Sequence, residues 1–323
     1  MSHEMPDVPA LGAAIQQPLD TTHLESGGRG RAARSTLARV LRQRSALVGL
    51  VILGFLFSVA ILAPVLTSYS PTKVLIGVEA DAKTRAEPCI HILGCPQTQT
   101  EHLFGLDGNV RDEFSRVVWG ARVSLAVGFI TVGWSIVVGM LIGAVAGFVG
   151  GWVDNVLMRL MDMLLAFPAL LLAIVVVTVL GKGLTNAMLA IGVVAVPIYA
   201  RVIRSSVLSV REQDYVTAAR ALGDSPINIL GRRVIPNAIT PLIVQATLGV
   251  GSAVLEIAAL SFIGLAAQAP DPEWGSMIGL ERSQLFTSPH LVFIPGVALT
   301  LTVLGFNLLG DGLRDAFDPR LSR

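Results

Sequence analysis

Six stretches of the chain are apolar and nearly free of charged residues, and each is long enough to cross a lipid bilayer as a helix. A helix rises about 1.5 Å per residue, so about 17–25 residues span a hydrocarbon core of about 30 Å. With 53% hydrophobic and 15% charged residues and a mean hydropathy of +0.67, the composition is too apolar for a soluble domain. We therefore predict an all-helical polytopic membrane protein with six transmembrane helices. The stretches are residues 46–66, 123–153, 163–180, 184–200, 238–264 and 291–310.

The distribution of basic residues predicts which side of the membrane each end faces. Arginines gather just before the first apolar stretch, and an excess of basic residues beside a span marks its cytoplasmic side. Six spans that start from a cytoplasmic N-terminus return the C-terminus to the cytoplasm, so we expect both termini inside. The net charge of +1 argues against a nucleic-acid partner. The arginines are Arg29, Arg31, Arg34, Arg39, Arg42 and Arg44.

These patterns divide the chain into segments. The first is rich in Gly, Pro, Ser and polar residues without an apolar run, and we expect it to be a mobile cytoplasmic tail. A basic lead-in with the first span, an extracytoplasmic loop, a five-helix core and a cytoplasmic C-terminal tail follow. The five segments are residues 1–35, 36–66, 67–116, 117–310 and 311–323.

The outer loop contains the two cysteines of the chain, Cys89 and Cys95. Disulfides persist outside the cytoplasm, so a small disulfide loop is one prediction and two free thiols are the alternative. His91 and His102 lie in the same loop without a fixed spacing of ligands, which favours surface residues over a metal site. We predict no metal site in the chain.

A polar island at residues 201–237 separates the fourth and fifth spans and has the pattern helix, turn, helix. Gly223 follows an apparent helix and Gly commonly ends helices, while Ser225 before Pro226 forms an N-cap followed by a ring-fixed first helical residue. A second short helix is expected over residues 226–232. Because the island is basic, we place it in the cytoplasm.

The same island resembles the "EAA" loop of permease subunits of ABC importers. The Ala pair Ala218-Ala219, then Gly223 and then Pro236 follow the order of that motif, although Thr217 stands where the motif has Glu. Further matches resemble the dipeptide, oligopeptide and nickel branch: Tyr199-Ala200-Arg201, Tyr215-Val216, Leu260-Ser261-Phe262, Trp274-Gly275 and Gly310-Asp311-Gly312.

The resemblance implies a type I ABC importer permease fold in which a cytoplasmic coupling loop, residues 205–236, docks on an ATPase subunit. Packing and geometry would rest on the Ala pair and the glycine, and two charged residues would make polar contacts. The candidate coupling residues are Asp214, Tyr215, Ala218, Ala219, Arg220, Gly223 and Pro236.

The resemblance also implies partners and a cargo. Expected partners are a homologous second permease, two ATPase subunits that hold ATP and Mg, an extracytoplasmic substrate-binding protein and membrane lipid, in the cytoplasmic membrane of a prokaryote. The cargo would be a short peptide, with nickel, glutathione or another small solute as alternatives. An ion-coupled secondary transporter is an alternative of another class.

The chain itself is not expected to be an enzyme or to bind a cofactor. Gly181-Lys182-Gly183 lacks the spacing of a phosphate-binding loop, and no serine, histidine or aspartate lies in a catalytic motif. Energy for transport must then come from a partner.

Four residues in or beside the spans are candidates for a functional or structural role. Glu256 is a carboxylate well inside the fifth span, and such residues are functional candidates; it either lines the pathway and meets a peptide's ammonium group, or serves packing or gating. Arg159 and Asp162 are three residues apart and suit a pair on one helical face. Pro168 is expected to kink the third span.

A glycine stripe in the second span predicts a close helix contact. Gly139, Gly143 and Gly147 recur every fourth residue and share one face. The contact could lie within the chain or against a second permease.

Overall fold

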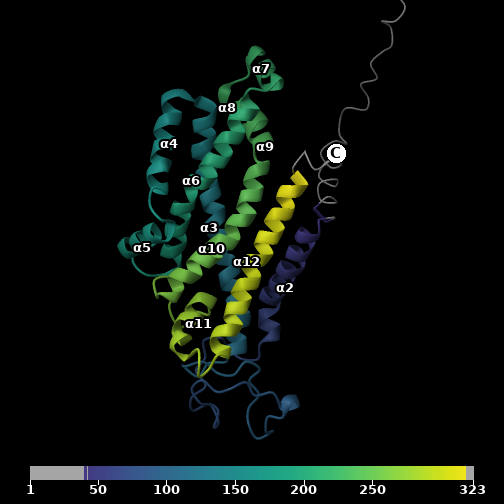
Figure 1. Cartoon of the computed structure of the whole chain (residues 1–323), viewed down its shortest axis with the longest axis vertical. Helices are drawn as coiled ribbons and strands as arrows, with labels where there is room; N and C mark the ends of the chain where they lie inside the picture. The colour runs from purple at the N-terminus through teal and green to yellow at the C-terminus, as the bar shows by residue number, and fades with distance from the viewer. Residues whose placement is uncertain (1–39, 42, 318–323) are drawn as a thin grey trace, which may run out of the picture.

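The computed structural model describes residues 40–41 and 43–317 and consists of helices joined by loops (Figure 1). The N-terminal tail predicted at residues 1–35 lies outside the described residues, and so do residues 318–323 of the predicted C-terminal tail. The helices are α2 (Arg44–Leu66), α3 (Glu113–Val149), α4 (Gly151–Leu165), α5 (Ala169–Leu180), α6 (Leu184–Arg211), α7 (Asp214–Ala221), α8 (Pro226–Ile229), α9 (Ile235–Ala238), α10 (Thr240–Phe262), α11 (Trp274–Glu281) and α12 (His290–Phe317).

Five of these helices, α2, α3, α6, α10 and α12, are long and apolar enough to cross a membrane. The third predicted span is broken: α4 and α5 meet at 92°, and the two helices count as a span only when they are taken together. The prediction of one kinked helix over residues 163–180 is therefore wrong. The cause is local, because Pro168 has no backbone N–H and adopts a ψ of 127° just before α5.

The second predicted span also ends earlier than expected. Helix α3 starts at Glu113, where the Asp112 side chain accepts a hydrogen bond from the Ser115 N–H at 2.8 Å. It stops at Val149, because Gly150 has a φ of +73° that a helix cannot continue through. The apolar run to residue 153 thus belongs to two helices.

Helices α3 and α6 form the closest contact of the bundle, and the glycine stripe makes it. A Cβ on Gly143 would collide with the Ala200 carbonyl, and a Cβ on Gly139 would lie 2.7 Å from the Tyr199 Cβ. Gly147 faces α6 in the same way one turn further on. The stripe therefore packs within the chain, which decides between the two alternatives that the sequence left open.

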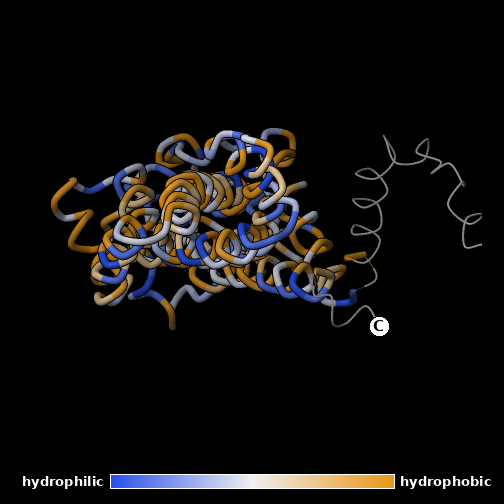
Figure 2. The backbone as a smooth tube through the Cα atoms, turned by 90° about the horizontal axis from the view of Figure 1, so that it is seen from above, coloured by the Kyte–Doolittle hydropathy of each residue, from blue (hydrophilic) through white to orange (hydrophobic). Residues whose placement is uncertain are grey.

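Helix α2 packs along α12, again through glycines. A Cβ on Gly49 would lie 2.8 Å from the Gly305 carbonyl oxygen, and Gly312 abuts Ala46. Many large apolar side chains on α2 remain exposed, among them Val51, Ile61 and Val65. Seen down the long axis, hydrophobic positions occur around the bundle as well as inside it (Figure 2), as expected for helices that face lipid.

Candidate functional site

The segment between α6 and α10 projects from one end of the bundle, with α7 at its tip (Figure 1). The start of α2 and the end of α12 lie at this same end, and the loop after α2 lies at the opposite end. Helix α6 continues to Arg211, so the first residues of the predicted loop 205–236 are helical and only the segment from Glu212 onwards leaves the bundle. We call residues 212–238 the coupling segment.

Helix α7 is held by one face. Val216 and Ala219 are buried there and belong to the same hydrophobic cluster as Ile229 and Val234, which follow the turn. Ala218 points to the other side and is exposed. Of the predicted alanine pair, only Ala219 packs, because residues 216 and 219 share a helical face and residue 218 does not.

The turn after α7 has the hydrogen bonds of a Schellman motif. Gly223 donates to the Arg220 carbonyl at 3.0 Å and Asp224 donates to the Ala219 carbonyl at 3.1 Å. Gly223 has a φ of +80°, and a Cβ at this position would meet no atom within 4 Å. The glycine is thus required by backbone conformation alone and not by space.

The next turn begins with the predicted cap. The Ser225 hydroxyl accepts from the Asn228 N–H at 3.4 Å, and Pro226 is the first residue of α8. The helix expected over residues 226–232 begins at Pro226 as predicted and extends further, because α8 continues through a π-helical turn at Leu230–Val234 into α9.

Asp224 connects the two sides of this turn. Its carboxylate accepts from the Asn228 amide at 2.8 Å and from the Arg233 guanidinium at 3.0 Å. These two hydrogen bonds lower the pKa of Asp224. The Tyr215 hydroxyl donates to the Arg233 carbonyl at 3.4 Å, so Arg233 joins α7 to the turn. Neither contact was predicted from the sequence.

Two large apolar side chains lie on the outward surface of the coupling segment. Leu222 and Ile227 are each 86% exposed on either side of the Gly223 turn. Asp214 is exposed as predicted, and Pro236 is also exposed. Arg220 instead turns back towards the bundle, with its guanidinium 5.9 Å from the centre of the Phe148 ring.

Three arginines of α6, just before the coupling segment in the chain, tie the helix to its neighbours. Arg204 binds Asp154 of α4 with two nitrogens, and Arg201 donates to Asp162 of α4 at 2.6 Å. The predicted pair Arg159–Asp162 is therefore wrong: Arg159 is exposed, and Asp162 reaches across to α6.

Arg211 completes these ties by donating to the Gly147 carbonyl at the end of α3, at 2.7 Å. The sequence analysis used the basic residues of this region to place it in the cytoplasm and quoted Arg201 as part of the family resemblance, but it did not predict these contacts. The role of Asp154 was missed, because pairing across α4 and α6 depends on a helix break that the sequence pattern did not reveal.

Glu256 lies on α10 and lines a cavity of about 120 Å³ between α3, α6, α10 and the bend that joins α4 to α5. Among the described residues that line it, none is Lys, Arg or His, and the other polar side chains are those of Thr131, Tyr199, Gln245 and Ser252.

The outer loop is held together by polar contacts and a disulfide. Cys89 and Cys95 are joined as a disulfide with 5.4 Å between their Cα atoms. The prediction that His102 is a surface residue is wrong: its ring is 5% exposed and bonds to Asp112 at 2.9 Å and to Glu79 at 3.0 Å. Both acids are remote in sequence from each other, which is why spacing did not show the pair.

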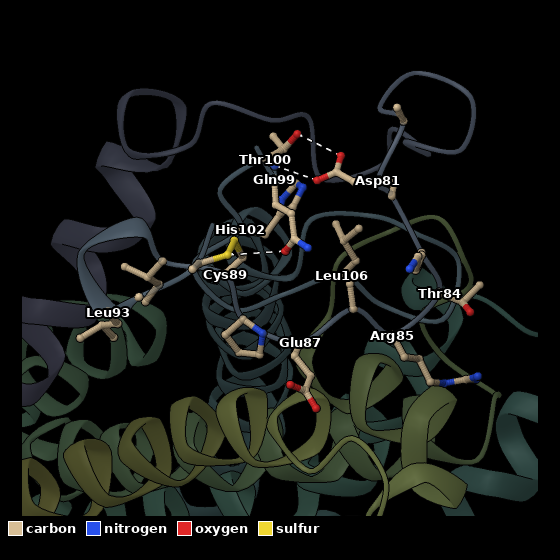
Figure 3. A pocket seen from close by; sticks show the side chains of 18 residues that line it. Asp81, Thr84, Arg85, Glu87, Cys89, Leu93, Gln99, Thr100, His102 and Leu106 are labelled. Carbon is tan, nitrogen blue, oxygen red and sulfur yellow. Dashed lines mark hydrogen bonds between the residues drawn. A yellow bond between two sulfur atoms is a disulfide. The ribbon is translucent and has the colours of Figure 1, made fainter. Parts of the chain in front are cut away.

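A cavity of about 850 Å³ lies in this loop, and Figure 3 shows its walls. Two of the charged groups on its walls have partners: Asp81 accepts from the Thr100 N–H at 2.8 Å, and Arg85 binds Glu281 of α11 at 2.8 Å. These contacts stabilise the loop and attach it to α11. Among the described residues, no cluster of His, Cys, Asp or Glu has the arrangement of a metal site.

Several long apolar helices and a helical segment that projects from one end of the bundle define a multi-pass membrane protein. Residues 139–323 match the family described as binding-protein-dependent transport system inner membrane component, and residues 33–86 match the N-terminal transmembrane domain of oligopeptide transport permease C. The chain therefore belongs to the inner-membrane permeases of ABC importers, in the peptide branch.

Relatives and a solved structure agree with this assignment. The chain is 43% identical to the dipeptide transport system permease protein DppC of Alkalihalophilus pseudofirmus, over 89% of this chain and 90% of that protein. It is 42% identical to the glutathione transport system permease protein GsiD of Pectobacterium atrosepticum, over 68% and 73%. The inward-facing MetNI methionine ABC transporter has the same fold, with a TM-score of 0.52 at 19% identity over 63% of this chain and 97% of that chain.

Proposed function

We propose that this chain is one of two permease subunits of an ATP-driven importer for short peptides in the cytoplasmic membrane of a prokaryote. The dipeptide permeases among its relatives, which it matches along most of its length, support this cargo. Two ATPase subunits bind ATP and Mg on the cytoplasmic side, and a binding protein delivers cargo from outside. The coupling segment and both termini then face the cytoplasm.

The observation that carries the proposal is the form of the coupling segment. Leu222 and Ile227 are apolar, exposed and held outward by a defined turn, at the end of the bundle opposite the outer loop. An exposed apolar pair on a rigid turn suits insertion into a pocket of a partner. We assign this pair as the contact with the ATPase.

Movement of the docked turn can reach the membrane spans through two routes. The buried face of α7, at Val216 and Ala219, belongs to the main hydrophobic cluster of the bundle. The ties of Arg201 and Arg204 to α4 make α6 and the α4–α5 bend move together. A packed core transmits such displacements because it has little free volume. ATPase closure would thereby alter the packing of α4, α5 and α6 around the cavity.

Copurification tests the docking surface. We would express the chain with its partner subunits, extract the complex in a mild detergent and measure the amount of ATPase recovered for the wild type and for Leu222→Asp/Ile227→Asp. In the complex, the variant would lose two apolar side chains that the ATPase covers and would place two charges in the interface. We therefore expect at least about a hundredfold weaker association. Ile92→Asp is the matched control, because Ile92 is 93% exposed at the opposite end.

Two outcomes would contradict the proposal. If the double variant recovers as much ATPase as the wild type and retains uptake, the coupling segment is not the ATPase contact. Recovery of the chain alone, with uptake driven by an ion gradient, would contradict the importer itself and favour a secondary transporter.

Glutathione is a second candidate cargo, because several relatives at 42–44% identity are glutathione permeases. Uptake into proteoliposomes that contain the complete complex, with dipeptide and glutathione in competition, distinguishes the two. Nickel or another small solute would be indicated if neither competes.

A further inference from the structure

Polar residues of α10 form a stripe that runs towards the outer half of the helix. Gln245, Ser252 and Glu256 are separated by seven and four residues, so they lie on one helical face. Gly249 lies in the same stripe, and a Cβ there would collide with the Tyr199 hydroxyl of α6. Glu256 is 16 residues beyond Thr240 in this helix, or about 24 Å along its axis.

The opposite face of the same helix is different. Ile243, Ala246, Thr247 and Val250 line a separate apolar cavity with α2, α3 and α12. The helix therefore lines two cavities, and its polar side chains, the acid among them, lie mainly on the side of one of them. Such a division is expected where one face meets a hydrophilic cargo and the other meets apolar neighbours.

Glu256 has no partner of its own. Among the described residues, no hydrogen bond or ion pair reaches its carboxylate, and the wall of its cavity includes no basic side chain. A charged residue inside a membrane span costs about 2.5–3.5 kcal/mol on insertion scales. A carboxylate in this position is stabilised if a cation enters the cavity beside it.

Two hydroxyl groups of the cavity wall also suit a bound cation. The Thr131 hydroxyl of α3 is buried and lacks a hydrogen-bond partner among the described residues, and the Tyr199 hydroxyl lies across Gly249. A primary ammonium group has three N–H donors and no acceptor. A carboxylate and hydroxyl oxygens around it supply acceptors.

We propose that this cavity receives the amino-terminal ammonium group of the cargo, with Glu256 as its counter-charge. The proposal rests on the proposed function, since it concerns the end of a short peptide that carries a positive charge. The cavity's volume of about 120 Å³ accommodates a few water-sized groups, which is enough for the ammonium and the first carbon atoms. The rest of the peptide extends towards the second permease.

The position of the cavity connects it to the coupling route. Leu164, Leu165 and Phe167, at the bend between α4 and α5, form part of its wall. The same bend is tied to α6 through Asp162 and Arg201. A shift of α4 relative to α10 would change the wall that faces Glu256, so ATPase closure would expose or release the bound ammonium.

Binding to the permease–ATPase complex without its binding protein tests the proposal, because selection by the binding protein then does not enter. We would measure thermal stabilisation by a free-amine dipeptide and by the same dipeptide with an acetylated amino group, for the wild type and Glu256→Gln. The wild type should bind the free-amine form at least about tenfold more tightly, and Glu256→Gln should lose this preference. Thr247→Val, on the apolar face of α10, should behave as the wild type.

Uptake by the complete complex supplies the second measurement. Glu256→Gln should reduce the maximal rate of dipeptide uptake about tenfold, while ATPase stimulation by the loaded binding protein remains. An equal rate in Glu256→Gln, or equal binding of both dipeptides by the wild type, would overturn the proposal. Loss of ATPase stimulation together with uptake would indicate a gating residue instead. A wild-type complex that takes up no peptide would contradict the proposed function, whereas normal wild-type uptake with an unaffected variant contradicts this inference alone.

Discussion

The outer loop and the coupling segment lie at opposite ends of the molecule and are stabilised in different ways. At the outer end, Asp107, Arg111 and Arg116 are 4%, 3% and 1% exposed, and Asp107 forms ion pairs with both arginines. In the coupling segment, Leu222 and Ile227 are almost fully exposed, and the turn between them is held mainly by backbone hydrogen bonds. The outer loop thus contains a buried network of charges, whereas the turn of the coupling segment exposes two large apolar side chains.

This difference predicts where changes act. A buried ion pair must keep both partners, since removal of one leaves an uncompensated charge. An exposed apolar residue contributes little to the chain's own stability and much to a contact that covers it. Substitutions in the outer loop should therefore reduce stability, whereas substitutions in the coupling segment should reduce assembly and transport.

The largest effect on stability is expected for Asp107→Ala. Its carboxylate accepts from the Asn109 and Arg111 N–H groups at 2.9 and 2.8 Å and from the Arg111 guanidinium at 2.7 Å. Its loss leaves two buried arginines without their counter-charge, which should cost about 3–5 kcal/mol. Thermal unfolding of the purified complex measures the change.

Asp214→Ala is the matched control for Asp107→Ala, because Asp214 is an exposed aspartate in the coupling segment. We expect its unfolding temperature to stay close to that of the wild type. If both variants unfold alike, the distinction between a self-sufficient outer loop and a partner-dependent coupling segment is wrong.

The next largest effect is expected from Cys89→Ser/Cys95→Ser. This disulfide closes a short loop with a sequence separation of 6, so its contribution from the unfolded state is modest, about 2 kcal/mol. Unfolding should occur at lower temperature while ATPase recovery stays normal. Reduction of the wild type with dithiothreitol should reproduce the shift, and lower ATPase recovery after mild reduction would show that the two ends are not independent.

How far the sequence predicted this molecule depends on the range of the interactions. The cap at Ser225 and the left-handed residue at Gly223 were predicted correctly from short sequence patterns, because neighbouring residues determine both features. The long spans were predicted from apolar stretches, which are also a local property of the sequence. The break before α5 was underestimated, since a proline predicts a kink but tertiary packing fixes its angle.

Contacts between distant segments were not available from the sequence pattern. Asp162 was paired with the nearest arginine in the chain, but the structure pairs it with Arg201, 39 residues away. His102 was expected at the surface, yet it is enclosed by two acids from other parts of the loop. In the coupling segment, the outward position of Leu222 and Ile227 follows from the turn and not from the motif that led to it.

Gly223→Leu tests the coupling end with a smaller effect on stability. A φ of +80° costs a residue with a side chain about 1–2 kcal/mol, and the added side chain meets open space. We expect a slight loss of stability but strong uncoupling, so that ATP hydrolysis continues while uptake falls. Gly231→Leu is the control, because Gly231 also has open space but no positive φ. Full uptake by Gly223→Leu would show that the turn's shape does not matter for coupling.

The smallest effect is expected for the pH dependence of the outer loop. Burial alone lowers the pKa of His102, but hydrogen bonds to Asp112 and Glu79 and their negative charges outweigh it, so the pKa is raised. A raised pKa in the folded state means that the charged ring stabilises the fold below the unfolded value of about 6.5, and that this stabilisation is lost as pH rises through the folded value. Asp112 also caps α3, so deprotonation of His102 should weaken the start of that span.

Unfolding temperature measured between about pH 6 and about pH 9 checks this dependence. The wild type should lose a few degrees across the range, and His102→Gln, which keeps a hydrogen-bond donor but cannot be charged, should lose less. Tyr69 lies against the His102 ring at 5.1 Å, but its pKa is raised to about 12 and so it does not titrate in this window. An equal slope in wild type and His102→Gln would mean that the outer loop is held by Asp107 and its arginines, whatever the charge on the histidine.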